Sequence, residues 1–371
     1  MLVDERITAH DAGQRRSHAN SDQHTSDLAS HTPAKPRRQG ILHGHPRLRR
    51  GTWRRVGRGA PRIAVALPPM PELSRSLYRA GEGEQLVLLH GFTGAWHHWR
   101  PVLADLVARF DVIAPTLSGH DGGPPFQTDG PLTLATAADS LENHLDELGV
   151  NTPHVVGNSM GGALAIELAA RGRARSVVAL SPGGGWQPDS GEAERVARFF
   201  ARQTRLLRAT RSQLPRAMRR PLSRRLAFRD VMRHGELVSP ADALALAHSA
   251  IGCQVVEDVV AALRRGAADV VPQELHRVTA PVLIAWAERD RVLPMETCAS
   301  RFRSELQGAE FQVLPGVGHV PTWDNTPLVV DTITGWITRH TAVSSPARQR
   351  SRLRRRRRHP RPGARSASPA D

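Results

Sequence analysis

Cysteine is scarce in this chain, with only Cys253 and Cys298 among 371 residues. Two thiols cannot supply the disulfide framework of a small secreted protein, and their number fits a reducing cytoplasm. Neither cysteine has the spacing of a metal ligand. The adjacent His97 and His98 would point about 100° apart on a helix, which argues against a shared metal. We therefore expect no metal and no other cofactor.

Long apolar runs are also missing. No stretch approaches the ~20 apolar residues of a membrane span. The run Ile63–Leu67 follows a basic stretch, but it is shorter than the core of a secretory signal and ends in two prolines. The sequence therefore predicts neither a transmembrane nor a targeting segment, and we expect a cytoplasmic protein.

Lysine is nearly absent, since Lys35 stands against 50 arginines. The formal charge of +16 lies mainly in two tails: residues 1–70 carry 13 basic and 5 acidic side chains, and residues 341–371 carry 10 and 1. Residues 71–340, here called the body, carry 28 basic and 29 acidic side chains and are nearly neutral. We expect two disordered arms, because neither tail has enough apolar surface to fold. The near-neutral body gives no reason to expect an anionic polymer as substrate. Basic arms of this kind can bind nucleic acid or acidic membranes, but we favour no such role, because arginine is the default basic residue of this chain. Met70 is a candidate start.

The most informative motif is PHVVGNSMGG, from Pro153 to Gly162. It reads as an apolar strand, a tight turn and a helix, with the pattern G-x-S-x-G centred on Ser159. A serine at such a turn sits on a strained bend with its hydroxyl clear of the backbone, and the helix N-terminus points at the same spot. Ser159 is thus a candidate nucleophile. The alternative is an ordinary strand-to-helix turn with a surface serine.

Two further loops supply partners for this serine, in the chain order Ser, Asp, His. The apolar strand Pro281–Trp286 leads into a polar loop with Asp290, and the strand Glu310–Leu314 leads into a glycine-rich loop with His319. A serine hydroxyl needs a base, and the base needs an orienting acid. Glu288 remains an alternative acid, and His319 is one of 18 histidines.

An earlier loop completes the set. The strand Gln85–Leu89 is followed by His90-Gly-Phe-Thr-Gly94. Backbone N–H groups stabilise the charge that acyl transfer builds on a carbonyl oxygen, and Phe92 and Met160 are the candidate donors of this oxyanion hole. For His90 we favour a structural role that fixes the loop.

The segments LVLLHGFTGAWHHW, HVVGNSMGG, PVLIAWAERDRVLP and LPGVGHVP resemble the alpha/beta-hydrolase superfamily, over roughly Leu73 to His340. The resemblance implies a nucleophile, an acid, a base and two oxyanion donors at Ser159, Asp290, His319, Phe92 and Met160. It implies that Trp99 packs in the core. The loop Leu117–Gly123, which follows the predicted strand Asp111–Ala114, departs modestly from the family's pattern: Thr116 stands before the loop and Asp121 lies inside it.

Strands alternate with helices outside one long insertion, which predicts an α/β fold with a mostly parallel, doubly wound sheet covered on both faces. The insertion, about 183–278, reads as helices and matches the family's helical cap. We expect a disordered arm over 1–70, the hydrolase domain over 71–340 and an arginine-rich tail over 341–371.

Several cap residues allow two interpretations. Phe199, Phe200 and Leu206 could line an apolar pocket, but we favour packing within the cap. The arginines of this region could bind a substrate carboxylate, but we favour a solvated or structural role; examples are Arg219, Arg220, Arg224 and Arg225.

These features together predict a serine-dependent hydrolase of a small, largely apolar acyl compound, above all a carboxylic ester. Three alternatives stay open: a carbon–carbon bond hydrolase, a thioesterase or acyltransferase, and a non-catalytic ligand-binding protein. The first is considered because the serine turn GNSMGG resembles that of hydrolases that act on meta-cleavage products. A dehalogenase or epoxide hydrolase of this fold would need a carboxylate nucleophile, so Ser159 argues against both. The sequence leaves the oligomeric state open.

Overall fold

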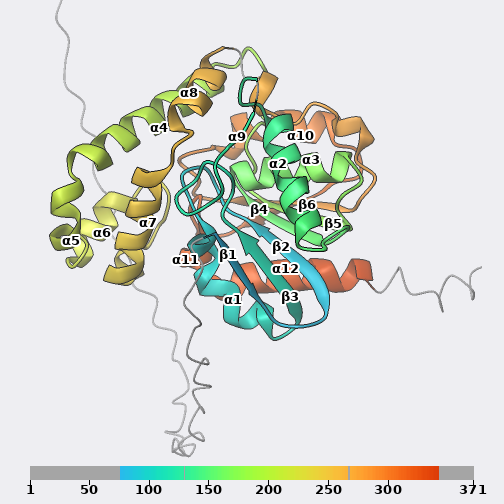
Figure 1. Cartoon of the computed structure of the whole chain (residues 1–371), viewed down its shortest axis with the longest axis horizontal. Coiled ribbons are helices and arrows are strands. Elements are labelled where there is room, and N and C mark those ends of the chain that lie inside the picture. The colour runs from blue at the N-terminus through green and yellow to red at the C-terminus, as the bar shows by residue number, and fades with distance from the viewer. Residues whose placement is uncertain (1–75, 129, 266–267, 342–371) are drawn as a thin grey trace, which may run out of the picture. The chain divides into compact units, whose positions relative to one another are not determined.

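The computed structural model describes residues 76–128, 130–265 and 268–341. Its centre is a seven-stranded sheet in the order β1-β3-β2-β4-β5-β6-β7, in which β1 is antiparallel to β3 and all other neighbours are parallel (Figure 1). The strands are β1 Leu77–Ala80, β2 Glu84–Leu89, β3 Phe110–Pro115, β4 His154–Asn158, β5 Ser176–Leu180, β6 Val282–Ala287 and β7 Glu310–Leu314. The predicted mostly parallel sheet is confirmed.

Helices cover both faces of this sheet, as a doubly wound fold requires. The helices of the described residues, those of the inserted segment between β5 and β6 included, are α1 Arg100–Val107, α2 Leu134–Glu147, α3 Met160–Ala170, α4 Glu192–Ala209, α5 Leu214–Ala217, α6 Pro221–Phe228, α7 Pro240–Gly252, α8 Val256–Arg264, α9 Met295–Cys298, α10 Ser300–Glu305, α11 Pro321–Asp324 and α12 Thr326–Thr341. Short 3-10 turns connect several of them.

Alternation along the strands divides the core into two halves, because successive side chains of a strand point to opposite faces. In β2, Leu86 and Leu88 pack with Trp99 and with the α12 residue Trp336 on one face. Val87 and Leu89 pack with the apolar sides of α2 and α3 on the other face. Burial on both faces explains why the central strands read as continuous apolar runs. The expected core position of Trp99 is confirmed.

The two edges of the sheet are the places where the sequence is least regular. β1 was not expected, because LYRA is only four residues long and shows no apolar alternation. It is held by its pairing with β3 and by an ion pair of 2.7 Å between Arg79 and Asp111. At the other edge, β7 has the predicted bounds, but only Leu314 of its five residues is buried.

The insertion between β5 and β6 forms the helical cap, here defined as α4–α8, residues 192–264 (Figure 1). The sequence predicts helices over Gly191–Arg208, Pro240–Gly252 and Val255–Arg265, with a break at Pro215 and Pro221. The helices α4, α7 and α8 agree with these bounds to within one residue, and the short helices α5 and α6 lie in the predicted break. Pro215 and Pro221 occupy the first turns of α5 and α6. A missing N–H costs nothing at those positions, so the prolines begin helices after the end of α4. The outer limits predicted for the cap, 183 and 278, stay a prediction.

The predicted arms are residues 1–70 and 341–371. Residues 1–70, with the candidate start Met70, and residues 342–371 lie outside the described residues, and Thr341 is the last residue of α12. Within the described ranges, no single helix is long and apolar enough to cross a membrane. The helices α7 and α8, which meet at a bend of 65°, satisfy the criteria of length and composition only as a pair.

Candidate active site

The turn between β4 and α3 has the geometry that its glycines predict. Ser159 has φ 56° and ψ −116°, a strained conformation for a residue with a side chain. A Cβ on Gly157 would lie 2.0 Å from the carbonyl oxygen of Gly161, and one on Gly161 would lie 2.1 Å from that of Leu89. Only glycine therefore permits so close an approach of helix and strands, which holds Ser159 at the end of β4.

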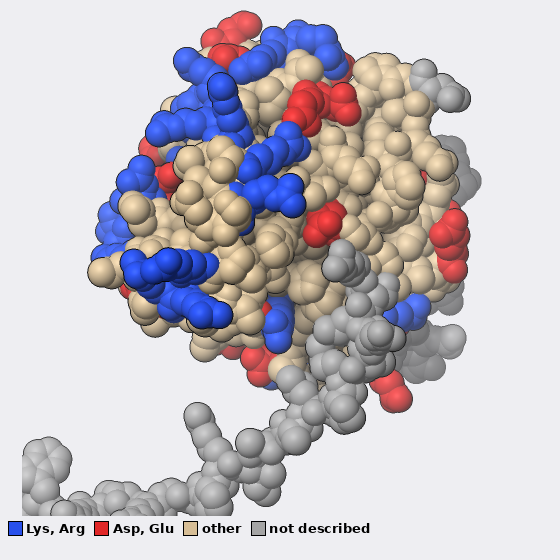
Figure 2. All heavy atoms as spheres, turned by 60° about the vertical axis from the view of Figure 1, so that its left-hand side comes forward, with Lys and Arg blue, Asp and Glu red and all other residues tan. Residues whose placement is uncertain are grey.

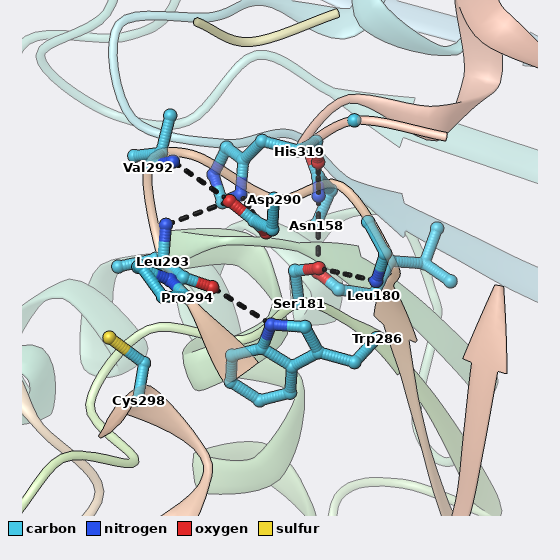
Figure 3. Close-up of polar contacts among 12 residues, drawn as sticks. Asn158, Leu180, Ser181, Trp286, Asp290, Val292, Leu293, Pro294, Cys298 and His319 are labelled. Carbon is cyan, nitrogen blue, oxygen red and sulfur yellow. Dashed lines mark hydrogen bonds and ion pairs between the residues drawn. The ribbon is translucent and has the colours of Figure 1, made fainter. Parts of the chain in front are cut away.

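A histidine and a carboxylate meet beside this turn (Figure 3). The Nδ1 atom of His319 lies 2.7 Å from Oδ2 of Asp290. The other carboxylate oxygen accepts hydrogen bonds from the backbone N–H groups of Val292 and Leu293, at 2.9 and 2.7 Å. Because the carboxylate oxygen of Asp290 can only accept, Nδ1 of His319 is the nitrogen that bears the hydrogen and donates. In the neutral imidazole, Nε2 then has the lone pair that can accept a proton. Nε2 has no hydrogen-bond partner among the described residues.

Glu288, the alternative acid, lies elsewhere. Its side chain is exposed, and its Oε2 accepts a hydrogen bond of 2.8 Å from the N–H of Gly316. It therefore supports the turn that leads to His319 but does not contact the imidazole. Of the two carboxylates, Asp290 alone is brought to the ring.

Asn158 is a site residue that the sequence analysis missed. Its side-chain Nδ2 donates to the carbonyl oxygens of Leu180 and His319, at 3.1 and 2.9 Å (Figure 3). The residue is 3% exposed. One amide thus ties the serine turn both to β5 and to the backbone of the histidine loop. Asn158 is a free position of the G-x-S-x-G pattern, so no sequence signal marked it.

The loop after β2 lies against the serine. A Cβ on Gly91 would come within 3.3 Å of the Cβ of Ser159. His90 fixes this loop: its Nδ1 donates to the oxygen of Gly91 at 2.9 Å, and its Nε2 accepts from the N–H of Leu117 at 2.9 Å. Burial, aided by nearby histidines, holds the pKa of His90 well below its usual range, so the ring stays neutral and can accept.

The expected oxyanion donors flank the same point. Met160 is the first residue of α3, directly after Ser159, and Phe92 follows Gly91. None of the hydrogen bonds found in the described part of the chain uses the N–H of Phe92 or Met160. Both N–H groups thus remain available to a ligand, and their role stays a prediction.

Two cavities meet at Ser159, and they share the side chains of Phe92 and Phe200. The first cavity has a volume of about 90 Å³, and its lining includes the polar side chains of His98, Gln203 and His319. The second has a volume of about 80 Å³ and is almost entirely apolar. None of the described residues that line either cavity is Asp, Glu, Lys or Arg.

The cap residues Phe199, Phe200 and Leu206 have different surroundings. Phe199 and Phe200 both pack against the buried core, as expected. Phe200 also lines both cavities, and its ring lies 4.9 Å from that of Phe92. Leu206 does neither, because 60% of it is exposed. The helical pattern of the sequence places Phe199, Phe200 and Leu206 on one helix, α4. It does not determine which side of that helix faces the cavities.

His98 brings a second imidazole into the first cavity. Burial, followed by the nearness of His319, lowers the pKa of His98 to about 4, so this ring is neutral at pH 7. Its Nδ1 has no hydrogen-bond partner among the described residues. His98 therefore adds a neutral polar group to a cavity whose described lining contains no Asp, Glu, Lys or Arg.

The cysteines take no part in this site. Cys253 and Cys298 are buried free thiols, and burial raises the pKa of each to about 12. Among the described residues, no group of three or more His, Cys, Asp or Glu side chains could hold a metal ion.

A comparison with protein families places this chain. The sequence model of the alpha/beta hydrolase family matches residues 86–332, which include every element of the candidate site. The chain belongs to the alpha/beta hydrolase family. Its resemblance to that superfamily and its predicted fold class are thereby confirmed.

One relative of this alpha/beta hydrolase is the epoxide hydrolase EphH of Mycobacterium tuberculosis. The two are 36% identical over 211 residues, which cover 56% of this chain and 95% of the relative. The similarity is thus to the whole of that protein and supports a hydrolase with a small-molecule substrate.

Two solved structures show the same fold. The 2-hydroxy-6-oxo-6-phenylhexa-2,4-dienoate hydrolase of Rhodococcus sp. strain RHA1 superimposes with a TM-score of 0.55 and 22% identity, covering 72% of this chain and 94% of that one. A thermophilic esterase of Thermogutta terrifontis gives a TM-score of 0.53 and 22% identity, covering 71% and 93%. At this identity the likeness concerns the fold alone.

Proposed function

We propose that this alpha/beta hydrolase is a serine-dependent enzyme that cleaves a small, largely apolar carboxylic ester. One observation carries the proposal. Ser159, on its strained turn, and His319, whose Nδ1 is bonded to a buried carboxylate, line the same uncharged cavity. The orientation of the imidazole leaves Nε2 as the base on the cavity side.

The reaction follows from these positions. Nε2 of His319 takes the proton of the Ser159 hydroxyl as Oγ attacks the ester carbonyl. The carbonyl oxygen becomes an oxyanion between the N–H groups of Phe92 and Met160. The C–O bond to the alcohol then breaks, and the alcohol leaves with the proton from His319. Water, deprotonated by the same nitrogen, cleaves the acyl-serine and releases the acid.

The two cavities define the substrate class. Because they meet at Ser159, the scissile carbonyl sits at their junction with one arm of the ester on each side. The second cavity is lined by apolar groups such as Leu134, Trp186 and Leu263, which suit an unbranched or aromatic hydrocarbon arm. The absence of charged lining among the described residues favours neutral esters over substrates with a free carboxylate or phosphate.

The direct test is hydrolysis of p-nitrophenyl esters of graded chain length. We expect Ser159→Ala to lower kcat by about 10⁴ or more, as loss of a serine nucleophile does in other enzymes. The exposed Ser190→Ala is the matched control and should keep the parent rate. A fluorophosphonate probe should add its mass to the peptide that contains Ser159. Equal rates of parent and Ser159→Ala, or labelling elsewhere, would contradict the serine mechanism.

Carbon–carbon bond cleavage is the second candidate, because the fold resembles that of a phenylhexadienoate hydrolase. The substrate in that protein's name is an acid, and a carboxylate anion calls for a basic partner. The described residues that line the two cavities include no Arg or Lys, which favours the ester. Loss of the yellow colour of a 2-hydroxy-6-oxo-dienoate at a higher kcat/KM than any ester would reverse this choice.

Epoxide opening, suggested by the name of the Mycobacterium relative, is disfavoured for this chain. The covalent route on this fold needs a carboxylate nucleophile, and the turn carries Ser159. Neither cavity has an Asp or Glu among its described lining residues. We expect no turnover of styrene oxide, measured as diol by chromatography, under conditions in which esters are cleaved.

A further inference from the structure

The cap contains a segment of unusual charge. Between Arg195 and Arg229 the sequence has 12 arginines and not one Asp or Glu. The near-neutral total of residues 71–340 hides this segment, because acidic side chains elsewhere in the body compensate for it. The charge of the body is therefore strongly uneven.

These arginines gather on one side of the molecule. Figure 2 turns the side with α4–α7 forward and shows many basic side chains there with few acidic ones among them. Arg195, Arg198, Arg208 and Arg229 have carboxylate partners, and the buried Arg224 binds the carbonyl oxygens of Met218 and Glu236. Seven others are exposed and form no ion pair with a described residue: Arg202, Arg205, Arg211, Arg216, Arg219, Arg220 and Arg225.

Large aliphatic side chains are exposed among them. Leu222 and Leu226, one turn apart on α6, are 80% and 63% exposed, and Leu206 on α4 is 60% exposed. Leu237, in a 3-10 turn that packs against α6, is 71% exposed. Other large hydrophobic residues exposed in the described ranges lie on the edge strand β7. We call these four leucines and the seven arginines the cationic-leucine surface.

We propose that the cationic-leucine surface docks on an anionic lipid bilayer. Helices that lie on membranes combine arginines, which meet lipid phosphates, with leucines that enter the boundary of the acyl chains. A nucleic acid would satisfy the arginines but leave four leucines in water, so the composition favours lipid. Met218, Ala227 and Phe228 of the same segment line the first cavity, but none of the four leucines and seven arginines lines either cavity, so the docking residues are separate from the cavity lining.

Binding of the full chain to vesicles tests the proposal. The probe is flotation with phosphatidylcholine vesicles that contain 30 mol% phosphatidylglycerol, with pure phosphatidylcholine vesicles for comparison. We expect binding to the anionic vesicles only. Arg219→Gln with Arg225→Gln should weaken the partition coefficient roughly 20-fold, since an arginine near the surface is worth about fivefold. Leu222→Ser with Leu226→Ser should weaken it on the order of tenfold, from lost apolar burial.

Matched variants separate this surface from general charge, including that of the sequence beyond residues 76–341. Arg109→Gln with Arg277→Gln removes the same charge from exposed positions outside the cap, and Phe311→Ser with Val313→Ser removes the exposed apolar pair of β7. Both should bind like the parent, and unfolding curves should show all variants folded. Equal losses from both arginine pairs, or parental binding of the leucine pair, would overturn the proposal. So would tighter binding to duplex DNA than to the vesicles, if the leucine pair leaves DNA binding unchanged.

Discussion

Asn158 shows how much one side chain can contribute to the geometry around the proposed nucleophile Ser159. Its amide connects the backbone of the histidine loop to β5, next to the strained turn. The imidazole of His319 is oriented from the other side by Asp290. The position of Nε2 thus depends on two restraints that act on one residue, one through its backbone and one through its ring.

Loss of the Asn158 amide should therefore reduce turnover without loss of the fold. We expect Asn158→Ala to lower kcat for a p-nitrophenyl ester about tenfold, because two buried hydrogen bonds worth about 1 kcal/mol each disappear. KM should change little, since the apolar cavity walls remain. Steady-state kinetics measures kcat and KM separately, and a change confined to KM would contradict a positioning role for Asn158.

Buried histidines near the site should make stability depend on pH. Burial lowers the pKa of His120, which is 4% exposed, to about 4. Below pH 6.5 the unfolded chain binds a proton that the folded chain refuses, so the free energy of unfolding falls as the pH is lowered towards 4. For His120 alone the loss between pH 7.5 and 5.0 is about 2 kcal/mol.

His120→Asn should remove the contribution of His120 to the decrease in the free energy of unfolding between pH 7.5 and 5.0. Chemical unfolding at pH 7.5 and 5.0 measures the difference, which should shrink by about 2 kcal/mol relative to the parent. The exposed His276→Asn controls for the loss of an imidazole. An unchanged difference in His120→Asn would mean that its ring can be protonated within the fold.

At the scale of elements, α4 decides the shape of the candidate site. Phe200 lies at the junction of the two cavities, while its neighbour Phe199 packs against the core and is not among the residues that line them. We expect Phe200→Ala to join the cavities and to shift the preference among esters towards bulkier acyl groups, with at least about a fivefold change in the kcat/KM ratio of long to short chains.

Phe199→Ala is the matched control for that change, because it removes the same ring from the same helix. It should lower thermal stability by an amount similar to Phe200→Ala or larger, yet keep the parental chain-length profile. If both variants keep the profile, Phe200 does not limit the substrate. Assays with p-nitrophenyl esters from two to twelve carbons provide the comparison.

The edges of the sheet illustrate which elements a sequence can reveal. The central strands carry enough apolar residues to be recognised alone, because helices bury them on both faces. β1 carries no such signal, because an antiparallel edge strand of four residues depends on its partner β3. Its existence is a consequence of tertiary pairing.

At the scale of the whole molecule, the domain limits make a testable proposal. All site residues lie within 90–319, and the last described residue, Thr341, donates a hydrogen bond of 3.0 Å to Glu84 of β2. We propose that a shortened chain from Met70 to Thr341 folds and keeps the turnover of the full chain. Ending it at His340, the predicted limit, should cost no more than about 1 kcal/mol of stability, the worth of this partly buried hydrogen bond.

Activity, solubility and unfolding of the two shortened chains check this proposal. Insoluble or inactive protein would mean that the basic tails contribute to the fold. Any polyanion binding by the tails of the full chain, measured with heparin, should fall steeply with salt and be lost on shortening.

The sequence alone determined the order and type of the central elements and the serine turn, and it supplied Asp290 and His319 as the proposed partners of Ser159 in chain order. These features depend on local patterns: apolar runs, glycines where a Cβ would clash, and polar residues directly after strands. The confirmed fold class rests on the same patterns.

Only the tertiary structure decided which residues meet. It selected Asp290 over Glu288, linked Asn158 to the histidine loop, turned Phe200 into the cavities and collected leucines among arginines on one surface. Each of these depends on the direction of a side chain relative to elements distant in sequence. Periodicity gives the spacing of residues along a helix or strand, but the packing of the elements determines what lies opposite each face.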